Sequence, residues 1–398
     1  MKCIQCDLDS NLKDRIANHG RCKYCKHPFA FEPTLMEAKI RFTDGFFAKA
    51  LTDVSTNGTL YFTRGQLLYL LKKRLVRKAR FARAGCVTYL ILVSTIGLIV
   101  NGLPGLVAPL VSMGPWIFIP FVVISFLLFL SLCNQYIPAM WLRWSDRRPQ
   151  QPKNIAKGIS ITESVVDIWL QQWQRFNPPP TRLLPPPSIP ASLAPAVADD
   201  VTAYSFDRVL VCESVAIAQL LIANNIHFEH NCAVLSISGY PQAIFATTMA
   251  MLRRNPDLQV IALHNCSPSG VALINQLRTS PDWYLDSGQV IFDLGMLPRQ
   301  IAAARGQAYI QVSADSAQDA RVMPPEVIKQ LSATELKWLE AGYFVDLESL
   351  TPQKLTQIVS QGIARLQNLG EDVGNNLILV GGFGSDDLTF VYAPDNFG

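Results

Sequence analysis

The chain contains one long stretch without any charge. No Asp, Glu, Lys or Arg occurs from Gly85 to Leu142. Two apolar runs within this stretch, at about residues 86–103 and 116–136, are each long enough to cross roughly 30 Å of hydrocarbon at about 1.5 Å per residue. Pro and Gly residues separate the two runs. The pattern therefore predicts a transmembrane hairpin of two helices over residues 85–142.

Positive charge lies on both outer flanks of the predicted hairpin. Arg77 to Arg83 precede the first run, and Arg143, Arg147 and Arg148 follow the second, while the loop between the runs carries no charge. Cytoplasmic flanks of membrane spans are enriched in Lys and Arg. The sequence thus predicts an integral membrane protein with two spans and with both termini in the cytoplasm.

Residues 205–366 alternate short apolar runs with helical periods, which is typical of an α/β domain with a mostly parallel sheet. Strands are predicted at 209–212, 259–263, 289–292 and 307–312. The first strand runs directly into Glu213. Ligands and metals gather at the strand ends along one edge of an open α/β sheet. Glu213 is therefore a candidate site residue by position, and a solvated strand-end Glu is the alternative.

Residues 34–83 read as helix, turn and helix. Apolar residues recur at helical spacing from Met36 to Asp53, and Thr63 can cap a second helix that starts at Arg64. Two short helices and an extended piece are typical of a winged-helix-like module.

A Pro-rich tether is predicted for residues 145–204, because repeated Pro favours extended and semi-rigid chain. Within it, Ser160-Ile-Thr-Glu163 has the pattern of a capping box and predicts an amphipathic helix. That helix either lies on a membrane surface or docks on a folded domain.

The strongest chemical signal is a set of four cysteines near the N-terminus. Cys3 and Cys6 form one Cys-x-x-Cys pair, and Cys22 and Cys25 form a second pair fifteen residues later. Each pair points two thiolates at one position, and four thiolates make a closed tetrahedral zinc site. We expect a structural zinc ribbon over residues 1–33, whose folding energy comes largely from the metal.

Charge is distributed unevenly along the chain. Residues 1–83 contain 17 Lys and Arg against 7 Asp and Glu, although the whole chain has a formal net charge of only +4. Such an excess favours an anionic partner for the N-terminal part. The basic run at residues 72–83 suits either DNA or the headgroups of a membrane surface.

Residues 206–270 resemble the Toprim domain of the topoisomerase VI A subunit and its meiotic double-strand-break relatives. That family has a Glu after the first strand, Gly-Tyr-Pro after the second, and Asp-Gly-Asp-Pro-Tyr-Gly after the third. This chain has Glu213, Gly239-Tyr-Pro241 and Asn265-Cys-Ser-Pro-Ser-Gly270 at the matching places. The resemblance implies a Toprim-like fold for about residues 205–366.

The chain departs from the family at both aspartates of the third motif. Asn265 and Ser267 stand in their places. The resemblance implies Mg²⁺ at this edge of the sheet, but Mg²⁺ prefers anionic oxygen ligands, and one Glu with an amide and a hydroxyl is a poor site. Asp286 or Asp293 could help Glu213 only if the fold brings either one near.

The end of the domain resembles the same family, in which a helix, a short Gly…Glu-Leu strand and a closing helix complete the fold. The matching segments here are residues 333–338, 342–350 and 352–355. Residues 367–398 are rich in Gly and Asn, and we interpret them as a C-terminal tail with one short strand.

In this family a winged-helix domain carries the tyrosine that attacks DNA, in an Arg-x-Leu-Tyr-Tyr motif. The nearest match is Gly65-Gln-Leu-Leu-Tyr69, so Tyr69 falls on the nucleophile position. Gly65 stands where the motif has Arg, with Arg64 one residue early. A half-buried helix aromatic is the alternative reading of Tyr69.

The sequence as a whole favours a membrane-anchored, non-catalytic nucleic-acid-binding protein with a degenerate Toprim-like domain. Its expected partners are membrane lipid and DNA. A membrane-bound scaffold for protein partners, or a homodimer, is an alternative. A third hypothesis is an active DNA-cleaving enzyme that uses Tyr69 and Glu213 with Mg²⁺, and the two lost aspartates weigh against it.

Overall fold

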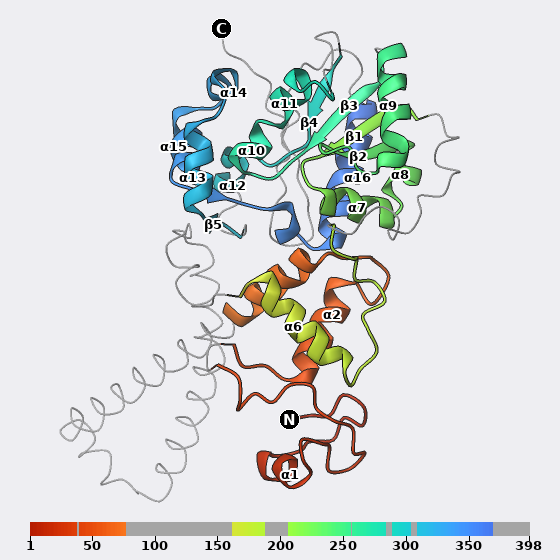
Figure 1. Cartoon of the computed structure of the whole chain (residues 1–398), viewed down its shortest axis with the longest axis vertical. Helices are drawn as coiled ribbons and strands as arrows, with labels where there is room; N and C mark the ends of the chain where they lie inside the picture. Colours follow the sequence, from red (N-terminus) through yellow and green to blue (C-terminus); the bar gives the residue numbers. More distant parts are fainter. Residues whose placement is uncertain are drawn as a thin grey trace, which may run out of the picture. The chain divides into compact units, whose positions relative to one another are not determined.

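A computed structural model of the chain describes residues 1–37, 40–76, 161–187, 206–255, 257–283, 289–303 and 309–368 (Figure 1). The chain divides into two compact units, Met1–Lys72 with Gln151–Gly398 and Lys73–Gln150. The features below belong to the first unit.

Three helices build an N-terminal helical module. They are α2 (Asp44–Val54), a helix that starts at residue 64, and α6 (Glu163–Gln174). The helix α2 begins eight residues later than the periodicity predicts, because Thr43 is its N-cap and accepts from the Phe46 N–H. The N-cap of α6 is Thr162, two residues later than the predicted capping box implies.

Aromatic side chains join α6 to α2. Trp169 packs edge-on against Phe42 with ring centroids 4.9 Å apart, and Trp173 lies 5.4 Å from Phe47. The backbone of Phe62 is bonded to the segment after α6, with a parallel bridge to Leu183. The amphipathic helix of the predicted tether therefore docks on the helical module.

The α/β domain has a four-stranded parallel sheet in the order β2-β1-β3-β4. The strands are β1 (Arg208–Cys212), β2 (Cys232–Ser236), β3 (Gln259–Leu263) and β4 (Ile291–Asp293). The helices that connect or cover them are α7 (Val215–Ala223), α8 (Ile226–Glu229), α9 (Gln242–Arg254), α10 (Pro268–Val271), α11 (Leu273–Thr279), α12 (Pro298–Ala303) and α16 (Pro352–Asn368).

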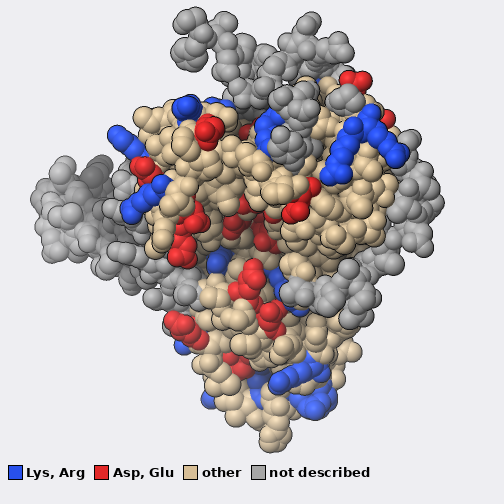
Figure 2. All heavy atoms as spheres, turned by 45° about the horizontal axis from the view of Figure 1, so that its top comes forward, with Lys and Arg blue, Asp and Glu red and all other residues tan. Residues whose placement is uncertain are grey.

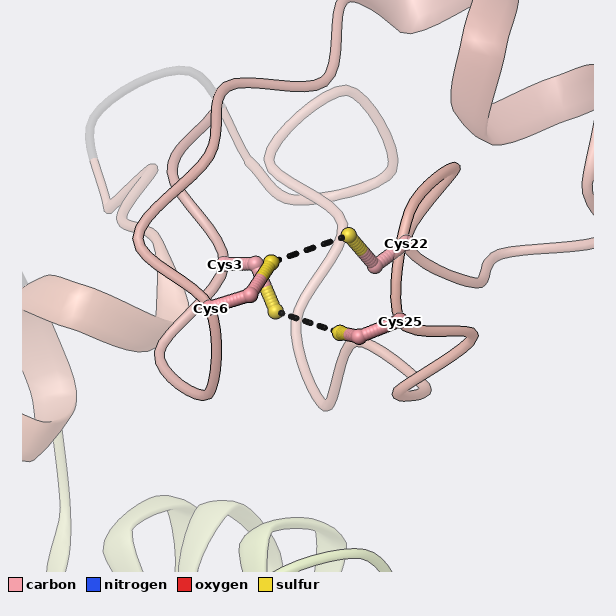
Figure 3. Close-up of side chains that lie close together, drawn as sticks. All are labelled: Cys3, Cys6, Cys22 and Cys25. Atoms are coloured by element: carbon pink, nitrogen blue, oxygen red, sulfur yellow. Dashed lines mark hydrogen bonds between the residues drawn. The ribbon is translucent and has the colours of Figure 1, made fainter.

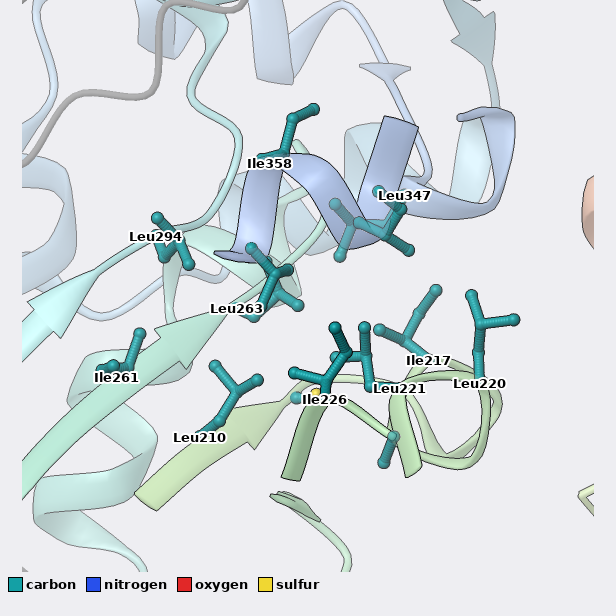
Figure 4. Packing of buried hydrophobic residues seen from close by; sticks show 14 of the residues in the cluster. Leu210, Ile217, Leu220, Leu221, Ile226, Ile261, Leu263, Leu294, Leu347 and Ile358 are labelled. Atoms are coloured by element: carbon teal, nitrogen blue, oxygen red, sulfur yellow. The ribbon is translucent and has the colours of Figure 1, made fainter. Parts of the chain in front are cut away.

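Apolar side chains bury both faces of this sheet. Strand residues point alternately to the two faces, so Leu210 and Leu263 pack with α7, α8 and α16 (Figure 4), while Val209 and Val260 pack with α9 and α11. Burial on both faces explains why the strands are almost entirely apolar in sequence.

A smaller part of the domain follows β4 and leads back to the sheet. It contains an antiparallel pair, β5 (Gln311–Val312) and β6 (Tyr343–Phe344), so the strand predicted at 307–312 is short and belongs to a second sheet. Three helices lie between β5 and β6, namely α13 (Ala314–Arg321), α14 (Pro325–Gln330) and α15 (Ala333–Glu340). A short turn of helix, η3 (Leu347–Ser349), then leads into α16.

No helix in these described ranges is both long and apolar enough to cross a membrane. The longest one described, α16, has 17 residues and an amphipathic sequence, whereas a span needs about 20 mostly apolar residues. On this finding the predicted fold class with a transmembrane hairpin is wrong, and so is the predicted location as an integral membrane protein with two spans and cytoplasmic termini. The segments at 86–103 and 116–136 lie outside the described residues.

Candidate functional site

Two short loops near the N-terminus share one backbone conformation, and each carries one cysteine pair. Residues 2–9 and 21–28 are each closed by an antiparallel bridge between their first and last residues. In each loop, the N–H of the first cysteine donates to the carbonyl five residues later, at 3.0 and 2.8 Å. The residue after the second cysteine has a positive φ in both, 55° at Asp7 and 60° at Lys26. The second loop therefore repeats the first, 19 residues further along the chain.

These loops bring the four cysteine sulfur atoms within 4.8 Å of one another (Figure 3). The Sγ atoms of Cys3 and Cys25 are 3.6 Å apart, and so are those of Cys6 and Cys22. Four thiolates about 2.3 Å from a tetrahedral ion are themselves about 3.8 Å apart. The four cysteines could therefore hold one metal ion. Within the described ranges, they form the one group of three or more His, Cys, Asp or Glu side chains close enough to do so.

The protonation of the cysteines differs with their surroundings. Burial raises the pKa of Cys3 to about 12. Burial also opposes the Cys22 thiolate, but the N–H groups of Cys25 and Tyr24, together with neighbouring thiols, lower the pKa of Cys22 to about 6. The knuckle of the second loop thus favours a thiolate, and a bound metal would favour all four.

The end of the ribbon is fastened to the helical module through one carboxylate. The N–H groups of Ala30 and Phe31 donate to Asp44 at 2.9 Å each. Asp44 is fully buried at the start of α2, and this burial raises the pKa of its carboxyl. The Gln172 Nε2 of α6 donates to the Ala30 carbonyl at 2.7 Å. Unfolding of the ribbon should therefore disturb the helical module, whose helices α2 and α6 are bonded to the end of the ribbon.

Glu213 follows β1 directly, and its carboxylate is bonded to the turn that follows β3. Oε2 accepts from the Asn265 N–H at 2.8 Å, and Oε1 accepts from the Ser269 hydroxyl at 2.7 Å and the Ser267 hydroxyl at 3.4 Å. A Cβ on Gly270 would lie 2.2 Å from the Asn265 carbonyl oxygen and 2.9 Å from the Glu213 carboxylate, so this close approach requires glycine. The Glu213 carboxylate holds the turn in place.

The same turn is covered by the C-terminal segment 343–350. The Asn265 Oδ1 accepts from the Leu347 N–H at 2.8 Å, and Cys266 and Val345 exchange two backbone hydrogen bonds of 2.9 Å. The Asn265 amide therefore has a structural partner within the chain.

Asp293, at the end of β4, is paired with His264, whose side chain is 1% exposed. Nε2 lies 3.0 Å from the Asp293 carboxylate, and Nδ1 lies 2.7 Å from the Asn265 carbonyl oxygen. Burial opposes both charged forms, but their contact raises the pKa of His264 and lowers that of Asp293. Because both ring nitrogens face an acceptor, the ring suits the doubly protonated form. Asp293 thus belongs to a buried ion pair, and Asp286 lies outside the described residues.

Tyr69 lies on the helix that starts at residue 64, and its hydroxyl is enclosed by two polar side chains. It donates a short hydrogen bond to Asp346, while Gln311 Nε2 donates to the Tyr69 oxygen at 2.6 Å and to Asp346 at 2.8 Å. Tyr69 is 8% exposed. Burial and the neighbouring Asp346 carboxylate raise the pKa of Tyr69 well above its usual range. Attack on a phosphate needs phenolate character and access, and this environment disfavours both.

The other side-chain contacts at the start of this helix leave no room for a side chain at Gly65. Thr63 donates to the Glu348 carboxylate at 2.6 Å, and Gln66 donates to the Leu350 carbonyl at 3.1 Å. A Cβ on Gly65 would lie 2.5 Å from the Glu348 carboxylate carbon. The segment 343–350 therefore occupies the space that a longer side chain at residue 65 would need.

Sequence reasoning missed Asp346, Gln311 and Glu348 as partners of this helix. Residues 342–350 stand out by resemblance, but nothing in their pattern names Tyr69 as a contact 277 positions away in the chain. A signal was present in Asp346 and Glu348, the two acidic residues of this otherwise mostly apolar segment, because buried polar groups need partners.

Charge is unevenly distributed over the surface. On the face in Figure 2, acidic side chains gather around a hollow in the middle, and basic side chains lie near the lower end and along the upper left and upper right. Exposed basic residues of the ribbon include Lys2, Lys13, Arg21, Lys23 and Lys26. An anionic partner is therefore more easily accommodated by the ribbon than by the acidic face.

No model of a known protein family matches the chain, and no curated protein matches it.

Proposed function

We propose that the protein binds nucleic acid without cutting it, through a zinc-held N-terminal ribbon. The observation that carries the binding part is the exposed basic surface of the ribbon, with Lys13, Arg21 and Lys23 among its exposed residues. Phosphate contacts from Lys and Arg supply most sequence-independent nucleic-acid affinity.

Zinc is the metal that we propose for the four cysteines. The ligand set is all thiolate, and closed tetrahedral sites of this kind select zinc or iron. The ribbon contributes few buried apolar side chains, among them Phe29. Zinc would therefore supply folding energy and leave no open position for chemistry.

The α/β domain has the role of a rigid, degenerate Toprim-like platform in this proposal. The strand order β2-β1-β3-β4 and the position of Glu213 after β1 support the resemblance. The internal hydrogen bonds of Glu213 and Tyr69 support a loss of catalysis, because each group already has structural partners. A Mg²⁺-dependent reaction has no part in the proposal.

Fluorescence anisotropy of the full zinc-loaded chain with labelled DNA and RNA tests the binding. The logarithm of the association constant should fall linearly with the logarithm of the salt concentration. A double variant, Lys13→Glu with Arg21→Glu, should bind much more weakly and show a shallower salt dependence. Arg253→Glu on α9 is a matched control, because it reverses an exposed charge far along the chain from the ribbon. Absence of binding even at low salt would refute the proposal.

A second candidate function is a scaffold for protein partners. It is favoured by the large apolar side chains that the ribbon and its exit expose, which are Ile4, Leu8, Leu12, Ile16, Tyr24 and Leu35. Exposed apolar groups of this density mark interaction surfaces. Crosslinking in cells separates the two functions, since protein adducts would dominate for a scaffold and nucleic-acid adducts for the proposed function.

A further inference from the structure

The two ribbon loops have one backbone and different surfaces. Because the second loop repeats the first at a spacing of 19 residues, each exposed position in one has an equivalent in the other. Lys2 corresponds to Arg21, and Gln5 corresponds to Tyr24. The two loops thus carry different side chains on the same backbone conformation, and the first loop can serve as a control for the second.

Only the second loop combines basic and aromatic side chains. Residues 21–28 expose Arg21, Lys23, Tyr24 and Lys26 and contain no acid. Residues 2–9 contain one Lys and two Asp, and no aromatic residue. An anion that approaches the ribbon therefore meets net positive charge at the second loop and net negative charge at the first.

The polar side chains that contact the lysines of this second loop come from α1 (Leu12–Ala17) and its C-terminal flank. Lys23 Nζ lies 3.7 Å from an Asp14 carboxylate oxygen, and Lys26 Nζ donates to the Asn18 side chain at 2.9 Å. The surface ion pair of Lys23 with Asp14 is weak and is screened by salt, and Asn18 is neutral, so both contacts compete poorly with a phosphate. The loop keeps its positive character.

Tyr24 stands at the tip of the loop, between the two cysteines of the second pair. It is 54% exposed, and Lys23 Nζ lies 5.6 Å from the centre of its ring. A metal held by the four cysteines would fix the backbone on both sides of the tip, because Cys22 and Cys25 both belong to the proposed site. Because the backbone under the ring would already be rigid, little conformational entropy would be lost when a flat group stacks on Tyr24.

We propose that the nucleic acid is single-stranded and that one of its bases stacks on Tyr24, with the backbone phosphates on the basic side chains of residues 21–28. This inference rests on the proposed function and names its substrate class. Basic side chains interleaved with an exposed aromatic ring are the means by which proteins hold unpaired strands. In a duplex the base faces are covered by their neighbours, so the ring would find no partner.

Anisotropy titrations with the full zinc-loaded chain test this, using a labelled oligothymidine, an oligouridine, and a duplex of the same length. The single strands should bind at least tenfold more tightly than the duplex. Tyr24→Ala should weaken single-strand binding about 5- to 100-fold, while Tyr24→Phe should keep it. Gln5→Ala, at the equivalent tip of the first loop, should have no effect.

Two tryptophan variants, read by fluorescence, test the stacking independently of Tyr24→Ala, which could lose its fold. Tyr24→Trp should show emission that is quenched when oligothymidine is added, and Gln5→Trp should not. Zinc content measured for every variant identifies any that lose the metal.

The outcomes separate this inference from the proposed function. If the duplex binds as well as the single strands, or if Tyr24→Ala binds normally and Tyr24→Trp is not quenched, the single-strand inference is wrong and the proposed function stands. If no nucleic acid binds at low salt, both are wrong.

Discussion

Removal of the Tyr69 hydroxyl should destabilise the fold and leave nucleic-acid binding unchanged. Tyr69→Phe deletes the donor to Asp346 and the acceptor for Gln311, and it keeps the ring that packs against Tyr309 at 5.3 Å. A hydrogen bond to a charged group contributes about 1.5–3 kcal/mol. The free energy of unfolding should fall by that amount, with a decrease in Tm of roughly 3–10 °C.

The stability lost in Tyr69→Phe should depend on pH and should become smaller at alkaline pH. Because folding raises the pKa of Tyr69, the folded chain keeps the phenolic proton at pH values where the unfolded chain, with a tyrosine pKa of about 10, has released it. This contribution to stability is fully present below about pH 10 and is lost as the pH rises above it, at about 1.4 kcal/mol per pH unit. Tyr69→Phe has no such loss, so the stability difference between the two proteins should narrow above about pH 10.

Urea unfolding followed by circular dichroism, from neutral to alkaline pH, measures both effects. Tyr24→Phe is the matched control, because its ring is 54% exposed and its stability should change by less than about 0.5 kcal/mol. A double-mutant cycle with Asp346→Asn should give a coupling of at least about 1 kcal/mol. Unchanged stability of Tyr69→Phe at every pH would refute the structural role of the hydroxyl.

Three further outcomes are expected. Zinc chelation, or Cys22→Ser, should unfold the ribbon and shift the emission of the α6 tryptophans, because the ribbon exit is bonded to their helix; fluorescence should recover when zinc returns to the wild-type chain but not to the variant. Gly65→Arg should displace Glu348 and lower stability by about 1–3 kcal/mol in thermal melts, whereas Gly45→Arg, whose Cβ would meet nothing within 4 Å, should not. Glu213→Gln should lower stability by about 1–3 kcal/mol through the turn after β3, and millimolar Mg²⁺ should alter the melting of neither protein.

Features that depend on neighbouring residues are predictable from the sequence. The spacing of the cysteines predicts the group of four sulfur atoms that could hold a metal ion, because a Cys-x-x-Cys knuckle can aim both thiolates at one point. The apolar runs at 209–212 and 259–263 predict β1 and β3 closely. A strand that is buried on both faces needs apolar side chains at nearly every position, so its sequence is recognisable.

Features that depend on distant residues are not predictable in the same way. The amphipathic pattern of α6 shows that one face is buried but does not show what covers it, and the partner proved to be the helical module. The environment of Tyr69 is set by Asp346 and Gln311, which lie more than 200 residues away. The assignment of Tyr69 as a nucleophile position rests on a local motif, whereas its chemistry depends on those distant partners.

We propose that this chain binds nucleic acid and does not cut it. The direct measurement incubates the zinc-loaded protein and Mg²⁺ with labelled single-stranded DNA and with supercoiled plasmid, then divides each sample between native and denaturing gels. We expect a retarded complex on the native gel, no protein-linked DNA on the denaturing gel, and plasmid that stays supercoiled. A covalent adduct that Tyr69→Phe abolishes, or no native complex at low salt, would contradict it.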